Sequence, residues 1–104
     1  MAYQRAIQTL GVPTRLSILE HLRGRPMPVG ELARRLPVSR PAVSQHLKVL
    51  KQAGLIKDRR VGNQRIYAID PVGLAELRNY VESFWAAALN ELKAVAETEG
   101  RKAP

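Results

Sequence analysis

The 104-residue sequence predicts a single, mainly α-helical domain with one small β-hairpin, an α+β fold. Two observations carry this prediction. Apolar residues recur every three or four positions in five segments, which is the spacing of amphipathic helices. A further segment, residues 55–69, is rich in β-branched residues and arginine and is interrupted by Gly62-Asn63. That pattern is typical of two strands joined by a tight turn.

Three helices are expected early in the chain, at residues 2–10, 13–22 and 29–36. Gly11 ends the first helix, and Pro13 suits the first turn of the second because the missing N–H of proline does no harm there. Pro26 and Pro28 lie too close together to continue a helix, so a connection is predicted between the second and third helices. Pro37 stops the third helix.

The fourth helix has clear signals at both ends. Ser39 is a good N-cap, since its hydroxyl can accept a hydrogen bond from a free backbone N–H, and Gly54 suits the residue just past a helix end. Val43, Leu47 and Leu50 share one face by helical spacing, so they are expected in the core. The opposite face carries the polar side chains of Gln45, Lys48 and Gln52, and Pro41 and Ser44 flank it.

The predicted hairpin places like charges opposite each other. With Gly62-Asn63 as a two-residue turn, Arg60 faces Arg65, and Arg59 adds a third charge close by. Directly opposed like charges destabilise a free hairpin, whereas DNA or RNA phosphates would neutralise them. The alternative is that the arginines at the tip splay into water.

Asp70 and Pro71 are expected to cap and begin a last helix, with residues 99–104 as a frayed tail beyond a helix at residues 71–98. Its apolar side chains form one stripe that is too long for so small a domain to cover, so we expect a two-fold dimer through this helix, helped by the first. The expected interface residues are Tyr3, Ile7, Leu77, Tyr80, Val81, Phe84, Trp85, Ala88 and Leu92.

A second interpretation of the aromatic residues remains open. Tyr3, Tyr80, Phe84 and Trp85 would alternatively line a pocket for a small-molecule inducer, which would then bind near Trp85. Aromatic stripes more often serve packing.

The order of elements is three helices, a turn, a fourth helix, a hairpin and a long helix. A helix-turn-helix followed by a β-hairpin is a winged helix, with the helix-turn-helix at residues 29–54 and the wing at residues 55–69. The second helix of such a motif enters the major groove of DNA and reads base edges mainly near its N-terminal end. Arg40, near that end, would reach a guanine or a phosphate. His46, at the border of the core face, is either a DNA or sensor contact or a half-buried histidine bonded to the backbone.

The net charge of +8 is concentrated in the middle of the chain. Residues 25–69 hold ten Lys and Arg against two acids, while residues 1–24 carry a net +2 and residues 70–104 a net −2. A basic centre indicates a polyanionic partner, most simply a nucleic acid. The alternative is a charged surface that only maintains solubility.

The run VGELARRLPVSRPAVSQHLKVLKQAGLIKDRRVGNQRIYAID, residues 29–70, resembles the winged-helix centre of the ArsR/SmtB transcriptional repressors, and VPTRLSILEHL is similar to their second helix. The resemblance is close over residues 10–70 and looser outside them. It implies a homodimeric repressor that binds an inverted-repeat operator. Family positions in or at the groove match Ser39, Arg40, Ser44, Gln45 and His46, and positions that approach the DNA backbone or minor groove match Arg59, Arg60 and Arg65.

The sequence departs from the family's metal sensors. Their cysteine pair would fall near Pro28 and Gly30, and other ligands would fall at residues 71–73 and 84–87, yet the chain has no cysteine and no histidine after His46. Transition-metal sites need clustered His, Cys or carboxylate groups. The resemblance, extended by FWAAALNELKAVAE in the last helix, therefore implies a branch that senses no metal, and neither a metal nor a cofactor is expected.

Double-stranded DNA and a second copy of the chain are thus the expected partners, and the expected DNA-binding residues are Ser39, Arg40, Pro41, Ser44, Gln45, His46, Lys48, Arg59, Arg60, Asn63 and Arg65. An RNA-binding or protein-docking winged helix is a weaker alternative, because residues 25–66 contain no aromatic residue for base stacking. An enzyme is not expected, since His21 and His46 have no evident acid or nucleophile partner. The sequence shows no signal peptide or membrane span, so a cytoplasmic location is expected.

Overall fold

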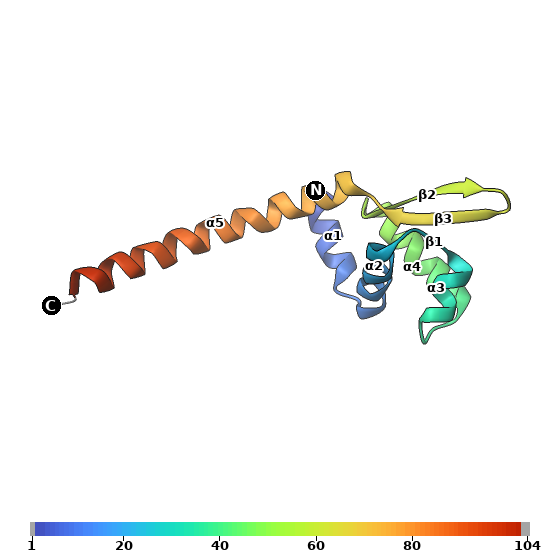
Figure 1. The fold of residues 1–104 in the computed structure, drawn as a ribbon, viewed down its shortest axis with the longest axis horizontal. Helices are drawn as coiled ribbons and strands as arrows, with labels where there is room; N and C mark the ends of the chain where they lie inside the picture. The colour runs from blue at the N-terminus through green and yellow to red at the C-terminus, as the bar shows by residue number, and fades with distance from the viewer. Residues whose placement is uncertain (1, 103–104) are drawn as a thin grey trace.

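The computed structural model describes the backbone of residues 2–102 and the side chains of residues 4–100. A small body of helices and strands carries one long helix that projects far beyond it (Figure 1), which gives the chain overall extents of 70 × 26 × 21 Å. The elements are α1 Ala2–Leu10, α2 Pro13–Gly24, β1 Met27–Pro28, α3 Val29–Arg35, α4 Arg40–Gln52, β2 Ile56–Val61, β3 Gln64–Ile69 and α5 Pro71–Lys102.

The core lies where α2, α3, α4 and the start of β2 meet. Its fully buried side chains are Ile18, Leu32, Val43, Leu47, Leu50, Leu55 and Ile56. The sequence prediction that Val43, Leu47 and Leu50 face inward is confirmed, and each of these three is 0% exposed. Because the inner face of α4 is fixed in this way, its polar face must point to solvent.

Both ends of α4 have the predicted caps. The Ser39 hydroxyl accepts a hydrogen bond from the Ala42 backbone N–H at 3.3 Å. Gly54 has a φ of +79°, and the backbone N–H groups of Gly54 and Leu55 donate to the carbonyls of Lys51 and Leu50 at 3.0 and 3.1 Å. These two bonds form a Schellman motif, which favours glycine because its central residue is left-handed.

The hairpin register is the predicted one. Val61 pairs with Gln64 and Arg60 with Arg65 across the turn. Gly62 takes a φ of +61°, while no non-glycine residue of the described chain has a positive φ. A two-residue turn with only its first residue in that region matches the type II′ geometry that joins twisted antiparallel strands.

The sheet has three strands, in the order β1-β3-β2, and not the two strands expected from the sequence. Met27 pairs with Tyr67 and Pro28 with Ile66, in a segment that the sequence had indicated to be a plain connection. Proline is accepted at a sheet edge because its missing N–H can face away from the neighbouring strand. The two prolines therefore end a helix without preventing a short edge strand.

The long helix α5 starts as predicted and ends later. Asp70 Oδ1 accepts a hydrogen bond from the Val72 N–H at 3.0 Å, which caps the first turn. The helix then continues to Lys102, so the expected end at residue 98 and the frayed tail from residue 99 are wrong as far as residue 102. Gly100 costs only about 1 kcal/mol in a helix, which does not stop one this long. Residues 103 and 104 lie outside the described chain.

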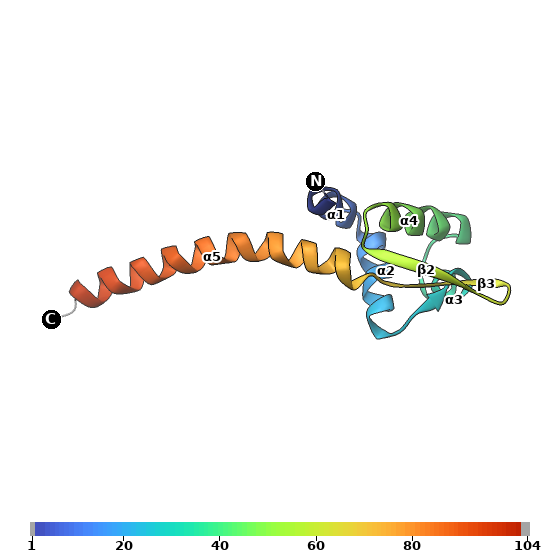
Figure 2. The same cartoon turned by 90° about the horizontal axis from the view of Figure 1, so that it is seen from above.

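A close backbone contact fixes the direction in which α5 leaves the body. A Cβ built on Gly73 would lie 1.7 Å from the carbonyl oxygen of Gly54, so only glycine allows the first turn of α5 to meet the end of α4. The helix α1 also packs against α5 near its origin. In both views the rest of α5 extends away from the body (Figures 1 and 2). None of the described helices combines the length and apolar character needed to span a membrane.

Candidate nucleic-acid interface

The predicted reading face of α4 is open to solvent. The side chains of Ser39, Arg40, Pro41, Ser44, Gln45 and Lys48 are all exposed. Hydroxyl, amide and cationic groups thus occupy the first half of a capped helix whose other face is held in the core. Such groups can donate to and accept from base edges or hold phosphates.

His46 lies apart from that face. It is half-buried, and its Nδ1 accepts a hydrogen bond from Nε of Arg15 on α2 at 3.2 Å. The expectation that a half-buried His46 would bond to the backbone is wrong, because its partner is a side chain. Arg15 thereby ties the middle of α4 to α2.

The wing arginines are exposed but do not form one cluster. Strand residues alternate between the two faces of a sheet, so the pair Arg60 and Arg65 shares one face while Arg59, which pairs with Ile66, lies on the other. Nε of Arg60 donates to the Gly62 carbonyl at 3.2 Å. Asn63 is exposed at the tip of the turn.

A buried carboxylate accounts for the stability of the opposed arginines. The side chain of Asp58 is only 5% exposed and lies 2.7 Å from Lys51 Nζ and 2.7 Å from Arg65 Nη1. The hydrogen bond from Lys51, followed by that from Arg65, lowers the pKa of Asp58 below its ordinary value, against the opposing effect of burial. Asp58 therefore links the C-terminal end of α4 to the wing, a connection that the sequence analysis missed.

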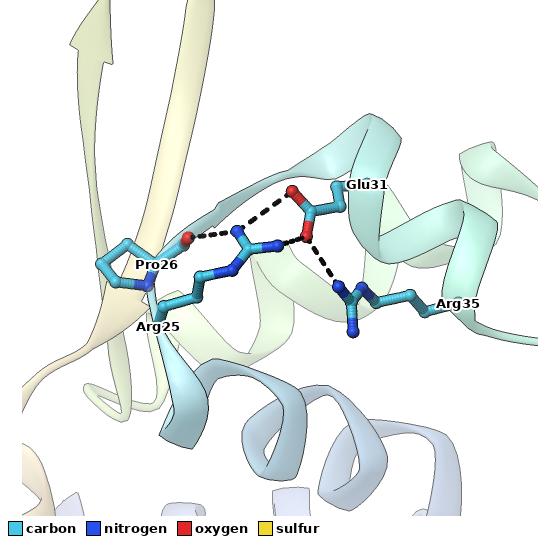
Figure 3. A network of polar contacts seen from close by, with 4 residues as sticks. All are labelled: Arg25, Pro26, Glu31 and Arg35. Atoms are coloured by element: carbon cyan, nitrogen blue, oxygen red, sulfur yellow. Dashed lines mark hydrogen bonds and ion pairs between the residues drawn. The ribbon is translucent and has the colours of Figure 1, made fainter.

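Glu31, the other acid of the basic segment 25–69, is also paired with cations. Glu31 on α3 accepts hydrogen bonds from Arg25, and it also forms an ion pair with Arg35 at 3.2 Å (Figure 3). Arg25 donates in addition to the Pro26 carbonyl at 3.4 Å. The Arg25 hydrogen bond is the main cause of the lowered pKa of Glu31. Each acid thus neutralises two cations.

The remaining cations of this segment are available to an external anion. Within the described residues, six of them have no acidic partner, and these are Arg34, Arg40, Lys48, Lys57, Arg59 and Arg60. Arg34 and Lys57 were not among the predicted site residues. Their exposure and basic side chains were visible in the sequence, but their position beside the wing and α4 follows only from the fold.

The structure gathers several of these groups around one hollow. A cavity of about 350 Å³ lies between α3, the start of α4 and the wing, and its lining includes Gly30, Arg34, Arg40, Asn63, Gln64 and Arg65. Arg40, Asn63 and Arg65 were predicted separately, from the helix and from the hairpin. The fold brings them to the same place, between the two elements expected to contact DNA.

The residues predicted for dimerisation lie mostly on exposed helix surface. Val81, Phe84, Trp85 and Leu92 are more than half exposed, Ile7 is 43% exposed and Ala88 is exposed as well. Tyr80 is half-buried, with its ring edge-on to Phe84 at 5.0 Å between centroids. Leu77 differs, since it packs against the core of its own chain. Leu89, 44% exposed, extends the apolar surface and was not predicted. The side chain of Tyr3 lies outside the described part of the structure.

Other classes of site find little support in the described side chains. Among residues 4–100 there is no group of three or more His, Cys, Asp or Glu side chains that could hold a metal ion. The half-burial of Tyr67, which packs against the core, leaves the basic surface without an aromatic platform for stacking single-stranded bases.

Comparison with known proteins supports the same interpretation. A helix-turn-helix domain family matches residues 10–59. The HTH-type transcriptional regulator Rv2034 of Mycobacterium tuberculosis is 54% identical over 96 residues, which cover 92% of this chain and 90% of that protein. The transcriptional repressor SdpR of Bacillus subtilis is 36% identical over 80 residues, covering 77% and 89% of the two chains.

Solved structures extend the likeness to the fold. An ArsR-like transcriptional regulator from Rhodococcus sp. RHA1 matches with a TM-score of 0.77 at 29% identity, covering 93% of this chain and 92% of that one. A homodimeric winged helix-turn-helix DNA-binding domain from Mycobacterium bovis, a possible ArsR-family regulator, matches with a TM-score of 0.67 at 27% identity, covering 82% and 79%. These relatives are transcriptional regulators and not enzymes. The chain belongs to the ArsR/SmtB family of winged helix-turn-helix transcriptional regulators.

Proposed function

We propose that this regulator is a dimeric repressor that binds an inverted-repeat operator, reading bases with the first half of α4 and holding the flanking backbone with the wing. The observation that carries the proposal is the open polar face of α4, with Ser44, Gln45 and Lys48 exposed on a helix whose opposite side is fully buried. Unpaired cations on both sides of that face supply the affinity for phosphates.

The dimer is supported by the apolar stripe that α5 exposes in a single chain. Phe84 and Trp85 are each 62% exposed, and Leu92 is 64% exposed. Exposed apolar surface of this extent on a small domain indicates an interface. The Mycobacterium bovis domain of similar fold is homodimeric, and a two-fold axis would place two α4 helices for half-sites about one DNA turn apart.

Repression is supported by the relative SdpR, which is a repressor. A dimer that covers an operator overlapping a promoter would exclude the polymerase without further machinery. We expect the binding to the operator to take place in the cytoplasm, where the DNA of a bacterial cell lies. An inducer, if the protein has one, is proposed to bind beside Trp85, and a saturable change in the fluorescence of this single tryptophan on ligand titration is the test.

The decisive experiment begins with the operator. Genomic fragments bound by the purified protein are selected and sequenced, and the affinity for the recovered palindrome is compared with that for random DNA. Gln45→Ala is expected to reduce this discrimination by about 5- to 150-fold for each half-site, because a bidentate base contact is worth about 1–3 kcal/mol. Gln52→Ala, at the far end of the same face, is the matched control and should discriminate like the wild type. Equal discrimination by the Gln45 variant and the wild type would refute the proposed reading face.

A further inference from the structure

We propose that the hollow between α3, α4 and the wing is a seat for one phosphodiester group of the DNA backbone, held by Arg34 and Arg40. This inference rests on the proposed function and adds to it a specific site. It assigns Arg40 to the backbone, where the sequence left a guanine and a phosphate open, and it introduces Arg34 and Gly30 as site residues.

The two guanidinium groups converge on Gly30. A Cβ built on this glycine would lie 3.7 Å from Nη1 of Arg34 and 3.7 Å from Nη1 of Arg40. One arginine comes from α3 and the other from the first residue of α4, so helix packing alone brings them together. Because Gly30 has no side chain, the space in front of both groups stays open, as part of the cavity of about 350 Å³.

Two of the positive charges in the hollow, those of Arg34 and Arg40, have no acidic partner in the described protein. Glu31 also lines the cavity, but its carboxylate is held by Arg25 and Arg35 (Figure 3). Arg65, at the wing side, is held by Asp58. Arg34 and Arg40 are left beside Gly30 without an acidic partner, an arrangement of like charges that an external anion stabilises. Guanidinium groups match the geometry of phosphate oxygens better than ammonium groups do.

The position of the hollow identifies the anion as a backbone phosphate. When α4 lies in the major groove and the wing reaches the neighbouring minor groove, the DNA strand that separates the two grooves must pass between them. The hollow occupies this position, with α4 on one side and the wing residues Asn63 and Gln64 on the other. Phosphate contacts of this kind fix the register of the protein on the duplex.

The main test is the salt dependence of DNA binding. Arg34→Gln should weaken binding to operator and random DNA by a similar factor and reduce the slope of log K against log salt by about 0.9 for each lost contact, which is about 1.8 for a dimer. Arg35→Gln is the matched control, because the neighbouring guanidinium is held by Glu31 and faces no DNA in this arrangement. Circular dichroism and thermal melting are used to check that both variants fold.

A second pair of variants fills the seat itself. Gly30→Asp places a carboxylate between the two guanidinium groups and should weaken binding strongly, whereas Gly30→Asn, which has the same size without the charge, should weaken it less. A methylphosphonate substituted at each backbone position in turn should identify one phosphate per half-site whose neutralisation weakens the wild type more than Arg34→Gln, which keeps only Arg40 at this phosphate.

The outcomes distinguish a failure of the proposed phosphate seat from a failure of the proposed operator binding. If the wild type binds its operator specifically but Arg34→Gln keeps the wild-type slope, the seat is wrong and the function stands. If the wild type shows no preference for any genomic sequence, the proposed function fails instead. Calorimetry with inorganic phosphate, in the absence of DNA, tests whether the hollow binds free phosphate instead of a DNA phosphate. Saturable binding that is lost in Arg34→Gln would assign the hollow to free phosphate and overturn the DNA assignment.

Discussion

At the scale of single residues, two carboxylates control the charge of the surface that we propose faces DNA. Asp58 and Glu31 each hold two cations, and in doing so they leave a defined set of arginines and lysines free for phosphates. Asp58 is the more consequential of the two, since its side chain is almost fully buried and joins Lys51 of α4 to Arg65 of the wing. The orientation of the wing relative to α4 depends on this bridge.

Replacing Asp58 by asparagine tests the bridge through its pH dependence. The pKa of Asp58 in the folded protein lies below its ordinary value of 3.8, so the carboxylate stabilises the fold fully above about pH 4. This contribution is lost as the pH falls through the lower, folded-state pKa. Asp58→Asn should therefore be less stable than the wild type to urea at pH 7, and the difference should narrow as the pH falls below 4.

The control for this experiment is Glu20→Gln, which removes an exposed acid of α2 that forms no ion pair with any described residue. Its urea midpoint should follow the wild type at both pH values. A difference between Asp58→Asn and the wild type that stays constant down to pH 3 would show that the carboxylate charge does not hold Lys51 and Arg65.

The sequence predicted the local geometry of the candidate site better than the contacts between its elements. Turn chemistry at Gly62 was enough to place Arg60 opposite Arg65, because hairpin register follows from loop length and turn type. No sequence pattern indicated that Asp58 would reach Lys51, since that contact depends on how β2 packs against α4. The convergence of Arg34 and Arg40 at Gly30 also depends on the packing of two helices, which spacing along one helix does not determine.

At the scale of elements, the packing of α5 against the end of α4 requires glycine, with no side chain, at residue 73. A methyl group at Gly73 would overlap the Gly54 carbonyl, and both residues belong to backbone that the caps of α4 and α5 hold in place. Gly73→Ala is expected to lower the free energy of unfolding by about 1–3 kcal/mol, the usual cost of overpacking, and to change the angle at which α5 leaves the body.

The same substitution elsewhere in α5 supplies the control. A Cβ built on Gly100 meets nothing within 4 Å, so Gly100→Ala should leave the stability unchanged or raise it by up to about 1 kcal/mol, because alanine favours a helix. Denaturant unfolding of the two variants is the measurement. Equal stability of the two variants would mean that the contact between Gly73 and Gly54 adjusts without cost.

The elements themselves were largely predictable, with two instructive exceptions. Caps, prolines and apolar spacing placed all five helices and the hairpin. The strand β1 was missed because Met27 and Pro28, preceded by Pro26, carry no strand signal of their own, and they pair with the otherwise free edge of β3. The end of α5 was placed too early because glycine near a helix end usually marks a C-cap, whereas Gly100 lies inside the helix.

At the scale of the whole molecule, we propose that a second copy of the chain covers the exposed stripe of α5. Trp85 is the only tryptophan and is 62% exposed in a single chain, so its emission reports directly on the interface. The dimer should show blue-shifted emission that moves to longer wavelength on dilution, as the indole returns to water.

A charge placed on the stripe should separate the dimer without unfolding the body. Phe84→Glu lies on exposed helix surface, so the core of α2, α3 and α4 is retained, while two carboxylates would have to be buried at the interface of a dimer. We expect a monomer in sedimentation equilibrium and a red-shifted Trp85. Binding to the full palindrome should fall by 10²-fold or more, the order of avidity that a second linked site supplies, whereas binding to an isolated half-site should be unchanged.

The matched control is Asn90→Glu, which adds the same charge to the same helix about 180° away from Val81 and the stripe. This variant should remain dimeric and bind the palindrome like the wild type. If Phe84→Glu also remained dimeric, the two chains would have to meet through another surface, and the spacing of the two α4 helices would no longer follow from α5. The half-site measurement then decides between a misplaced interface and a misplaced reading helix, because only the latter changes the affinity for a single half-site.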